Sequence, residues 1–323
     1  MRAAMSNRIA APHSPAREAE VWAVAGGKGG TGKSFLVSSM GTCLARKQHK
    51  VVLVDFDLGG ANLHTFLNVA QSRRSLTRFF EDKDARLEDL VVPTEIDNLG
   101  LITGDLESVS PESVTFSRKG KLLRHLAKLD SRYVLVDLGA GCHPNILDTF
   151  LAADKMITLV VPEITSVENM YHFIKSVLYR KLIMTLKDYG FKDTARHVWQ
   201  KRESYGIRNL REFIDYLRRN MTYLEPILDK ELGGFTMHLA VNMARDSQDI
   251  HLGSSLKSIF DKYLGLKASY AGFITYDDAV WRSVRERRPF MLHFLSSRSS
   301  KEIEILVDNL VHDREIPPSW GQP

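Results

Sequence analysis

A short apolar segment runs directly into a glycine-rich turn near the start of this chain, where residues 21–34 read VWAVAGGKGGTGKS. An apolar stretch with helical periodicity, FLVSSMGTCLARK, follows. A strand, a glycine loop and a helix in this order form an anion site. The glycines let successive backbone N–H groups point at one polyphosphate, and the helix adds its positive dipole end. This stretch by itself favours an α/β fold built around a bound phosphate.

The loop has the residue types of a phosphate-binding P-loop, G-x-x-x-x-G-K-S. Lys33 can reach the β- and γ-phosphates of a nucleotide, and the Ser34 hydroxyl is placed to bind Mg²⁺. The loop residues that we expect to contact the nucleotide are Gly27, Lys28, Gly29, Gly30, Thr31, Gly32, Lys33 and Ser34. Lys28 has no function in an ordinary P-loop, and taken alone it could be a solvated lysine.

Two further apolar segments end in acidic residues. The segment VVLV precedes Asp55 and Asp57 in a D-x-D-x-G-x-x-N string, and YVLV precedes Asp137 and a glycine-rich loop. Parallel sheets gather their ligands at the carboxyl ends of the strands, so we expect these acids close to the P-loop. An apolar strand with a terminal aspartate has the form of a Mg²⁺-binding Walker B segment. Asp55 and Asp57 could instead only cap a turn.

Taken together, the strings K-G-G-T-G-K-S, D-x-D-x-G-x-x-N and V-D-x-G-A-G resemble those of the MinD/ParA family of ATPases, over about residues 21–178 and 234–295. Within that family the stretches DLGGANLH and DLGAG are most similar to the FlhG flagellar regulators. The DQAxxL activating motif of those regulators is absent from residues 1–20. The resemblance implies ATP and Mg²⁺ as cofactors and a dimer as the active form.

The resemblance also implies roles for individual residues. Lys28 matches the signature lysine that crosses a dimer interface to the nucleotide of the facing subunit, and we expect it to be solvated and unpaired in the monomer. Asp57 matches the acid that orients the attacking water. Asn242, at the end of the segment FTMHLAVN, matches an asparagine that bonds adenine, although it could also be a turn residue. The candidate catalytic residues are Lys28, Lys33 and Asp57, and the candidate metal ligands are Ser34, Asp57 and Asp137.

Alternating strand and helix patterns predict one α/β domain over residues 20–315, with a mainly parallel, doubly wound sheet. A flexible leader (1–19) and a tail (316–323) flank it. Two short helices are expected from SLTRFFE and RLEDLVV. Near the end, KEIEILVDNL predicts a helix docked through Ile303, Leu306, Val307 and Leu310, with Glu302 on an acidic outer face that anionic lipid would repel.

Residues 179–233 predict a helical insertion that is absent from the shorter family members. The part from 179 to 219 is basic, with eleven Lys and Arg against five Asp and Glu, while the whole chain carries a net charge of only +5. Such a surface could contact DNA phosphates or an acidic membrane, or remain a solvated face.

The whole pattern predicts a slow ATPase that dimerises with ATP and positions or regulates a flagellum, a division site or a DNA cargo. Homodimerisation and an activating protein partner are expected from the resemblance. The absence of an apolar run of eighteen residues favours a cytoplasmic protein, with peripheral attachment to the plasma membrane as the alternative. The competing functions are an ATP-gated, DNA-binding partition protein and a scaffold that binds ATP without hydrolysing it.

Overall fold

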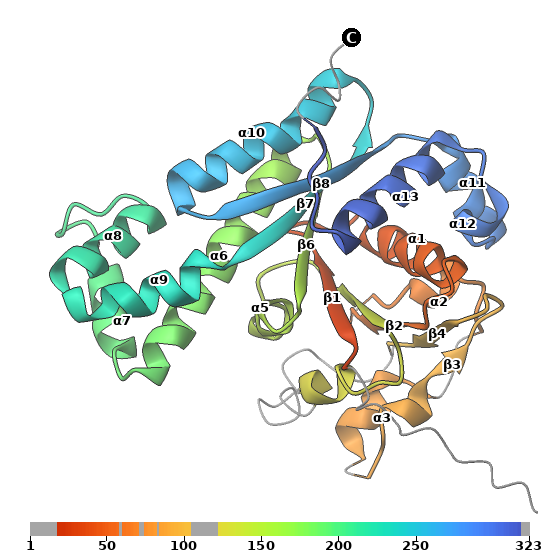
Figure 1. The fold of residues 1–323 in the computed structure, drawn as a ribbon, viewed down its shortest axis with the longest axis horizontal. Helices are drawn as coiled ribbons and strands as arrows, with labels where there is room; N and C mark the ends of the chain where they lie inside the picture. The colour runs from red at the N-terminus through yellow and green to blue at the C-terminus, as the bar shows by residue number, and fades with distance from the viewer. Residues whose placement is uncertain (1–17, 58–59, 71–73, 83, 105–121, 318–323) are drawn as a thin grey trace, which may run out of the picture.

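The computed structural model describes residues 18–57, 60–70, 74–82, 84–104 and 122–317, and these form one eight-stranded sheet between two layers of helices (Figure 1). The strand order is β3-β4-β2-β5-β1-β6-β7-β8, and every neighbouring pair is parallel except β3 and β4. The strands are β1 (Glu20–Ala25), β2 (Val51–Phe56), β3 (Val92–Pro93), β4 (Leu99–Ile102), β5 (Tyr133–Leu138), β6 (Lys155–Val160), β7 (Thr236–Ala244) and β8 (Lys267–Thr275). This confirms the mainly parallel, doubly wound α/β fold.

The central strands are apolar along almost their whole length because helices cover both faces of the sheet. One layer contains α1 (Lys33–Arg46), α2 (Leu63–Phe66), α11 (Asp278–Glu286), α12 (Phe290–His293) and α13 (Arg298–Val311). The other contains α3 (Leu76–Glu81), α5 (Pro144–Leu151), α6 (Ile164–Asp188) and α10 (Ser247–Leu264). Residues 122–126 are also helical. The two layers bury separate apolar clusters on opposite faces of the sheet.

The final helix, α13, docks as the sequence predicts: Ile303, Leu306, Val307 and Leu310 are fully buried against the sheet and α1. The prediction for Glu302 is wrong. Its side chain is only 8% exposed, and its carboxylate accepts hydrogen bonds from the backbone N–H and the hydroxyl of Thr275, at 2.7 and 2.9 Å. The end of β8 supplies donors at this helical position, so the carboxylate is buried without being left unpaired.

The segment around residues 86–92 differs from the expected helix. A single 3₁₀ turn, η1 (Glu88–Leu90), leads into β3, which pairs antiparallel with β4 at the sheet edge. Pro93 cannot donate a backbone hydrogen bond, and an edge strand tolerates it where a helix interior does not. The other predicted helix, SLTRFFE, is confirmed as α3. The leader up to residue 17 and the tail from residue 318 lie outside the described residues.

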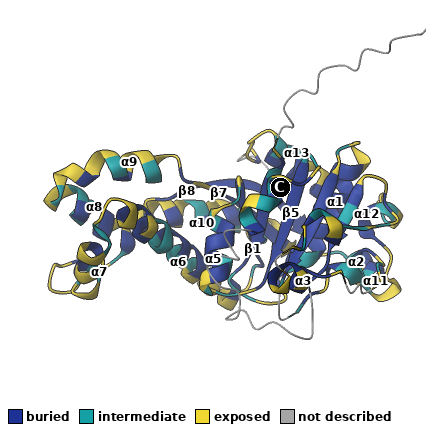
Figure 2. Ribbon diagram, turned by 90° about the horizontal axis from the view of Figure 1, so that it is seen from below, coloured by how far each residue is buried: buried dark blue, intermediate teal, exposed yellow. Residues whose placement is uncertain are grey.

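The predicted insertion is helical and projects beyond the sheet (Figures 1 and 2). It consists of the far end of the 25-residue helix α6 followed by α7 (Lys192–Gln200), α8 (Leu210–Asn220), η3 (Thr222–Leu224) and α9 (Glu225–Gly233). We call residues 189–233 the helical arm. Phe213, Leu217, Leu224 and Leu228 are fully buried within it, so the arm has its own apolar packing. In the part of the chain that the structure describes, no helix is both long and apolar enough to cross a membrane.

Candidate nucleotide-binding and catalytic site

The glycine-rich loop lies between β1 and α1, at the carboxyl end of a central strand. Gly30 and Gly32 have φ values of 77° and 91°, which side-chain-bearing residues rarely adopt. Gly27 is required for a different reason, because a Cβ atom there would lie 2.1 Å from the carbonyl oxygen of Asn169 in α6. The loop is therefore packed directly against α6 and has the backbone of an anion-binding turn.

Strand order brings the predicted acids to this loop. β5 lies between β1 and β2, and Asp137 is aligned with Val24 of β1 and Asp55 of β2. Lys33, in the first turn of α1, is only 8% exposed and is close enough to Asp137 to lower the pKa of its carboxyl. The sequence prediction that these residues converge at one edge of the sheet is therefore met by the structure.

The Asp137 carboxylate is almost completely buried, and neither of its oxygens has a hydrogen-bond partner among the described residues. Burial, followed by repulsion from Asp55, raises the pKa of Asp137 to about 8. The Ser34 hydroxyl is near enough to lower this pKa without completing a hydrogen bond. A buried, unpartnered carboxylate beside a hydroxyl and a P-loop fits the oxygen ligands that Mg²⁺ prefers.

Asp55 is equally buried but is satisfied by the backbone. Its two oxygens accept hydrogen bonds from the N–H groups of Asp57, at 3.2 Å, and Leu63, at 3.0 Å. Burial still raises the pKa of Asp55 to about 6, against the effect of these bonds. Asp55 therefore shapes the loop after β2, which is a structural function.

The Asp57 carboxylate lies beside two glycines. Cβ atoms placed on Gly60 and Gly139 would lie 3.5 and 3.1 Å from its oxygens. Gly139 belongs to the loop that follows Asp137, so the side chain of Asp57 touches the segment that leads from the candidate metal ligand into α5. This position is compatible with the role in orienting water that the family resemblance assigns to it.

Lys28 is not unpaired, contrary to the sequence-based expectation. Its ammonium donates to Glu163 Oε2 at 3.0 Å and to Thr165 Oγ1 at 3.1 Å, at the start of α6. The side chains of Lys28 and Glu163 are nevertheless 40% and 61% exposed. This contact could not be predicted from the sequence, because Glu163 follows Lys28 by 135 residues. An exposed pair of this kind contributes only about 0.2–1 kcal/mol.

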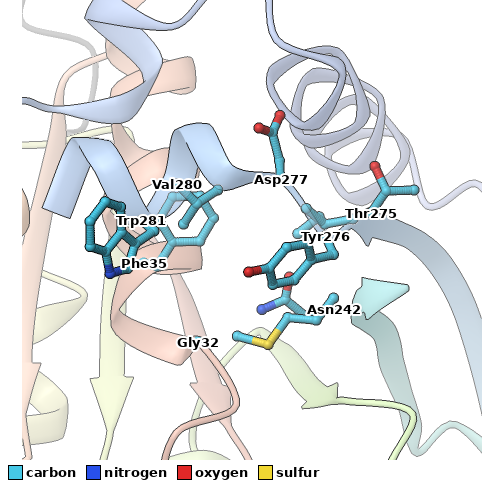
Figure 3. A pocket seen from close by; sticks show the side chains of 10 residues that line it. Gly32, Phe35, Asn242, Thr275, Tyr276, Asp277, Val280 and Trp281 are labelled. Atoms are coloured by element: carbon cyan, nitrogen blue, oxygen red, sulfur yellow. The ribbon is translucent and has the colours of Figure 1, made fainter. Parts of the chain in front are cut away.

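A pocket of about 250 Å³ adjoins the loop, between the start of α1 and the ends of β7 and β8 (Figure 3). Asn242 lies inside β7 and is not a turn residue, and its amide nitrogen donates to the Thr31 carbonyl at 2.8 Å. Its amide oxygen is left to accept a hydrogen bond. Figure 3 shows Phe35, Tyr276 and Trp281 around the same space.

These aromatic side chains were not identified as site residues from the sequence. Phe35 follows Ser34 directly, and Trp281 lies in the first turn of α11, shortly after the end of β8. Tyr276 and Trp281 are 53% and 60% exposed, which is unusual for large aromatic side chains and could have marked them only once the fold was known. Flat apolar side chains beside an amide acceptor suit a nucleobase.

Residues 22–290 match the CobQ/CobB/MinD/ParA nucleotide binding domain. The chain belongs to this family. One curated relative, the septum site-determining protein MinD of Escherichia coli K12, is 31% identical over 163 residues, which cover 47% of this chain and 56% of the relative. The matched region covers 46–63% of the length of the first curated relatives, so the chain spans about half the length of the curated relatives that it matches.

Solved structures of MinD/ParA proteins have the same fold. MinD from Pyrococcus horikoshii OT3, complexed with Mg-ADP, superposes with a TM-score of 0.60 at 18% identity, covering 90% of this chain and 96% of that one. A chain of the MinC:MinD cell division protein complex of Aquifex aeolicus gives a TM-score of 0.61 at 20% identity, covering 93% of this chain and 98% of that one. At these identities the likeness establishes the fold alone.

Proposed function

We propose that this MinD/ParA protein binds ATP with Mg²⁺, dimerises, and hydrolyses the ATP slowly. The observation that carries the proposal is the buried carboxylate of Asp137, which has no hydrogen-bond partner in the described structure and lies next to Lys33 and Ser34. Such a group is costly unless a cation satisfies it. A metal-bound nucleotide on the P-loop supplies that cation.

The roles follow from where the side chains lie. Backbone N–H groups from Gly27 to Ser34 would hold the phosphates, with Lys33 at the β- and γ-phosphates. Ser34 and Asp137 would hold Mg²⁺, which neutralises charge that develops on the phosphates. Asn242 would accept a hydrogen bond from the amino group of adenine, because its amide nitrogen is already bound to Thr31.

Catalysis would be completed by a second copy of the chain. In an ATP-bound dimer, Lys28 leaves Glu163 and Thr165 and stabilises charge on the phosphates of the neighbouring subunit. Breaking the exposed contacts costs at most about 1 kcal/mol in each subunit, which a buried lysine–phosphate contact can offset. Asp57 orients the attacking water beside the Gly139 loop, so nucleotide state and dimer state change together.

The cellular role that we propose is the positioning or regulation of a cellular structure from the cytoplasm, with a protein partner that stimulates hydrolysis. The positioning role is supported by the curated relatives, which are named septum site-determining proteins, and a protein partner by the solved MinC:MinD complex of Aquifex aeolicus. A flagellum or a DNA cargo is an alternative target to a division site.

The test uses Asp57→Ala, which should bind ATP without turning it over. We expect this variant to have the mass of a dimer in solution with ATP, and the mass of a monomer with ADP or without nucleotide. Phosphate release should be measurable for the wild type and lost in Asp57→Ala. An unchanged mass under every nucleotide would refute the dimer switch, and an ATP-dependent dimer without phosphate release by the wild type would identify a scaffold.

Lys28→Ala separates nucleotide binding from turnover. We expect it to bind ATP within about twofold of the wild type and to lose at least about a hundredfold in phosphate release, because a missing charge donor acts only on the transition state. Lys33→Ala is the comparison, since it should lose ATP binding itself. Normal turnover in Lys28→Ala would exclude the proposed contribution of the neighbouring subunit.

A further inference from the structure

Only some of the basic side chains on the helical arm and the adjoining end of α6 form ion pairs with carboxylates. Several cations there bond to carboxylates: Arg180 to Asp148, Lys181 to Glu231, Arg208 to Glu212, and Arg218 to Asp215 and Asp229. Among the described residues, no carboxylate lies within 4.0 Å of Lys187, Lys192 or Arg196. Lys201, Arg202, Arg211 and Arg219 of the arm also have no carboxylate within 4.0 Å in the described structure, but Lys187, Lys192 and Arg196 lie together, where α6 ends and α7 begins.

The same three side chains line a cavity of about 260 Å³ between α6 and α7, two helices that pack against each other (Figure 1). Ile183 and Met184 form its apolar wall, and Met184 is 39% exposed. Arg180 also lines the cavity, and Asp188 is its single acidic lining residue. The cavity therefore combines an apolar wall with Lys187, Lys192 and Arg196, which we call its cationic rim.

This combination selects among the anionic partners that charge alone would allow. A lipid bilayer offers a broad surface, whereas the apolar wall at Ile183 and Met184 is confined to one small cavity. A DNA backbone presents phosphates but no apolar group to fill the cavity. An acidic peptide with an apolar side chain satisfies both features, because the side chain enters the cavity while its carboxylates meet the rim.

We propose that this cavity is a docking site for an acidic segment of a partner protein. An apolar side chain of that segment is seated against Met184 and Ile183, and flanking carboxylates pair with Lys187, Lys192 and Arg196. The leader of the same chain does not fit, because residues 1–17 contain three arginines and no acidic residue. The site makes no use of the P-loop, so the proposal is independent of ATP hydrolysis.

The first experiment measures binding of a fluorescent synthetic peptide, with a leucine between clusters of glutamates, by anisotropy at low salt. We expect Lys187→Glu/Arg196→Glu to weaken binding at least about tenfold, because two attractions become repulsions. The matched control, Lys128→Glu/Lys262→Glu, makes the same change of charge at exposed lysines elsewhere and should stay within about twofold. All four positions are exposed, and circular dichroism checks that each variant is folded.

The second experiment tests the apolar wall. Replacing the leucine of the peptide by serine, or Met184 by serine, should each weaken binding roughly fivefold, and the two changes together should cost little more than either one. Duplex DNA and vesicles containing phosphatidylglycerol are the competing probes. The proposal is overturned if the wild type does not bind the peptide, if both double variants weaken it equally, or if either competing probe binds more tightly and is lost in Lys187→Glu/Arg196→Glu. ATP binding, measured in parallel, should be unchanged in every variant.

Discussion

Asp137→Asn should stabilise the protein when metal and nucleotide are absent. The carboxylate is buried without a hydrogen-bond partner in the described structure, and its pKa is raised to about 8 from an ordinary value of 3.8. Because the pKa of this carboxyl is higher in the folded protein, its ionisation destabilises the folded state. This penalty is absent below pH 3.8, where the carboxyl is protonated in both the folded and the unfolded state. The free energy of unfolding then falls as the pH rises from 3.8 to 8. Asparagine carries no charge at any of these pH values.

The size of the gain follows from the pKa. At pH 8 the raised pKa corresponds to roughly 5 kcal/mol of lost stability relative to the protonated carboxyl. An amide and a protonated carboxyl both leave buried polar atoms without partners, so that cost of about 1–3 kcal/mol is common to both and cancels. The substitution should therefore gain about 5 kcal/mol at pH 8 and only roughly 2 kcal/mol at pH 5.

Urea unfolding in EDTA, followed by circular dichroism at both pH values, measures this difference. Asp55→Asn is the matched control. Asp55 is as buried as Asp137, but each of its two oxygens accepts a backbone hydrogen bond. Asparagine has only one side-chain oxygen, so the substitution loses one of these two acceptors. Its gain at pH 8 should be at least about 2 kcal/mol smaller. A destabilised Asp137→Asn protein at pH 8, or a gain independent of pH, would refute the reasoning. Saturating Mg-ATP should stabilise the wild type more than Asp137→Asn.

Three other predictions concern the packing of Gly27, the packing of Leu306 and the burial of His238. Gly27→Ala should lower the melting temperature and ATP affinity, because the new Cβ would lie 2.1 Å from a carbonyl oxygen of α6, whereas Gly29→Ala, with nothing within 4 Å, should change stability by less than about 1 kcal/mol. Leu306→Ala should cost about 2–5 kcal/mol in urea unfolding, far more than Ile305→Ala on the outer face of α13. Burial lowers the pKa of His238 to about 4 from an ordinary 6.5, so the wild type should lose up to about 3 kcal/mol as the pH falls from 6.5 to 4, and His238→Gln should remove that dependence.

The parts of the site that could be predicted are those whose chemistry is local. The P-loop is one continuous stretch, and Asp55 and Asp137 each end a recognisable buried strand. Because parallel strands place their carboxyl ends at one edge, these pieces could be assembled without knowing the strand order. The position of β5 between β1 and β2, which puts Asp137 beside Asp55, had to be seen in the structure.

The features that were missed depend on contacts between distant segments. Glu163 pairs with Lys28 only because β6 lies next to β1. Glu302 was assigned to the outer face of α13 from its charge. In the structure it lies beside the end of β8, where the N–H and hydroxyl of Thr275 donate hydrogen bonds to its buried carboxylate. Trp281 reaches the P-loop region through a chain reversal after β8. In each case tertiary contacts override a tendency read from neighbouring residues.

Helix α6 runs without a break from the P-loop to the base of the helical arm (Figure 1). Its first turns bind Lys28 and pack on Gly27, and its last turn carries Lys187 at the base of the arm. At 1.5 Å per residue this helix is about 37 Å long, so a tilt of about 5° at the P-loop would swing the far end by about 3 Å. About two-thirds of the way along it, Arg180 bonds Asp148 of α5 at 2.7 and 2.9 Å, which links α6 to the helix that follows the Gly139 loop. A rearrangement at the phosphates that tilted α6 would therefore also displace the arm.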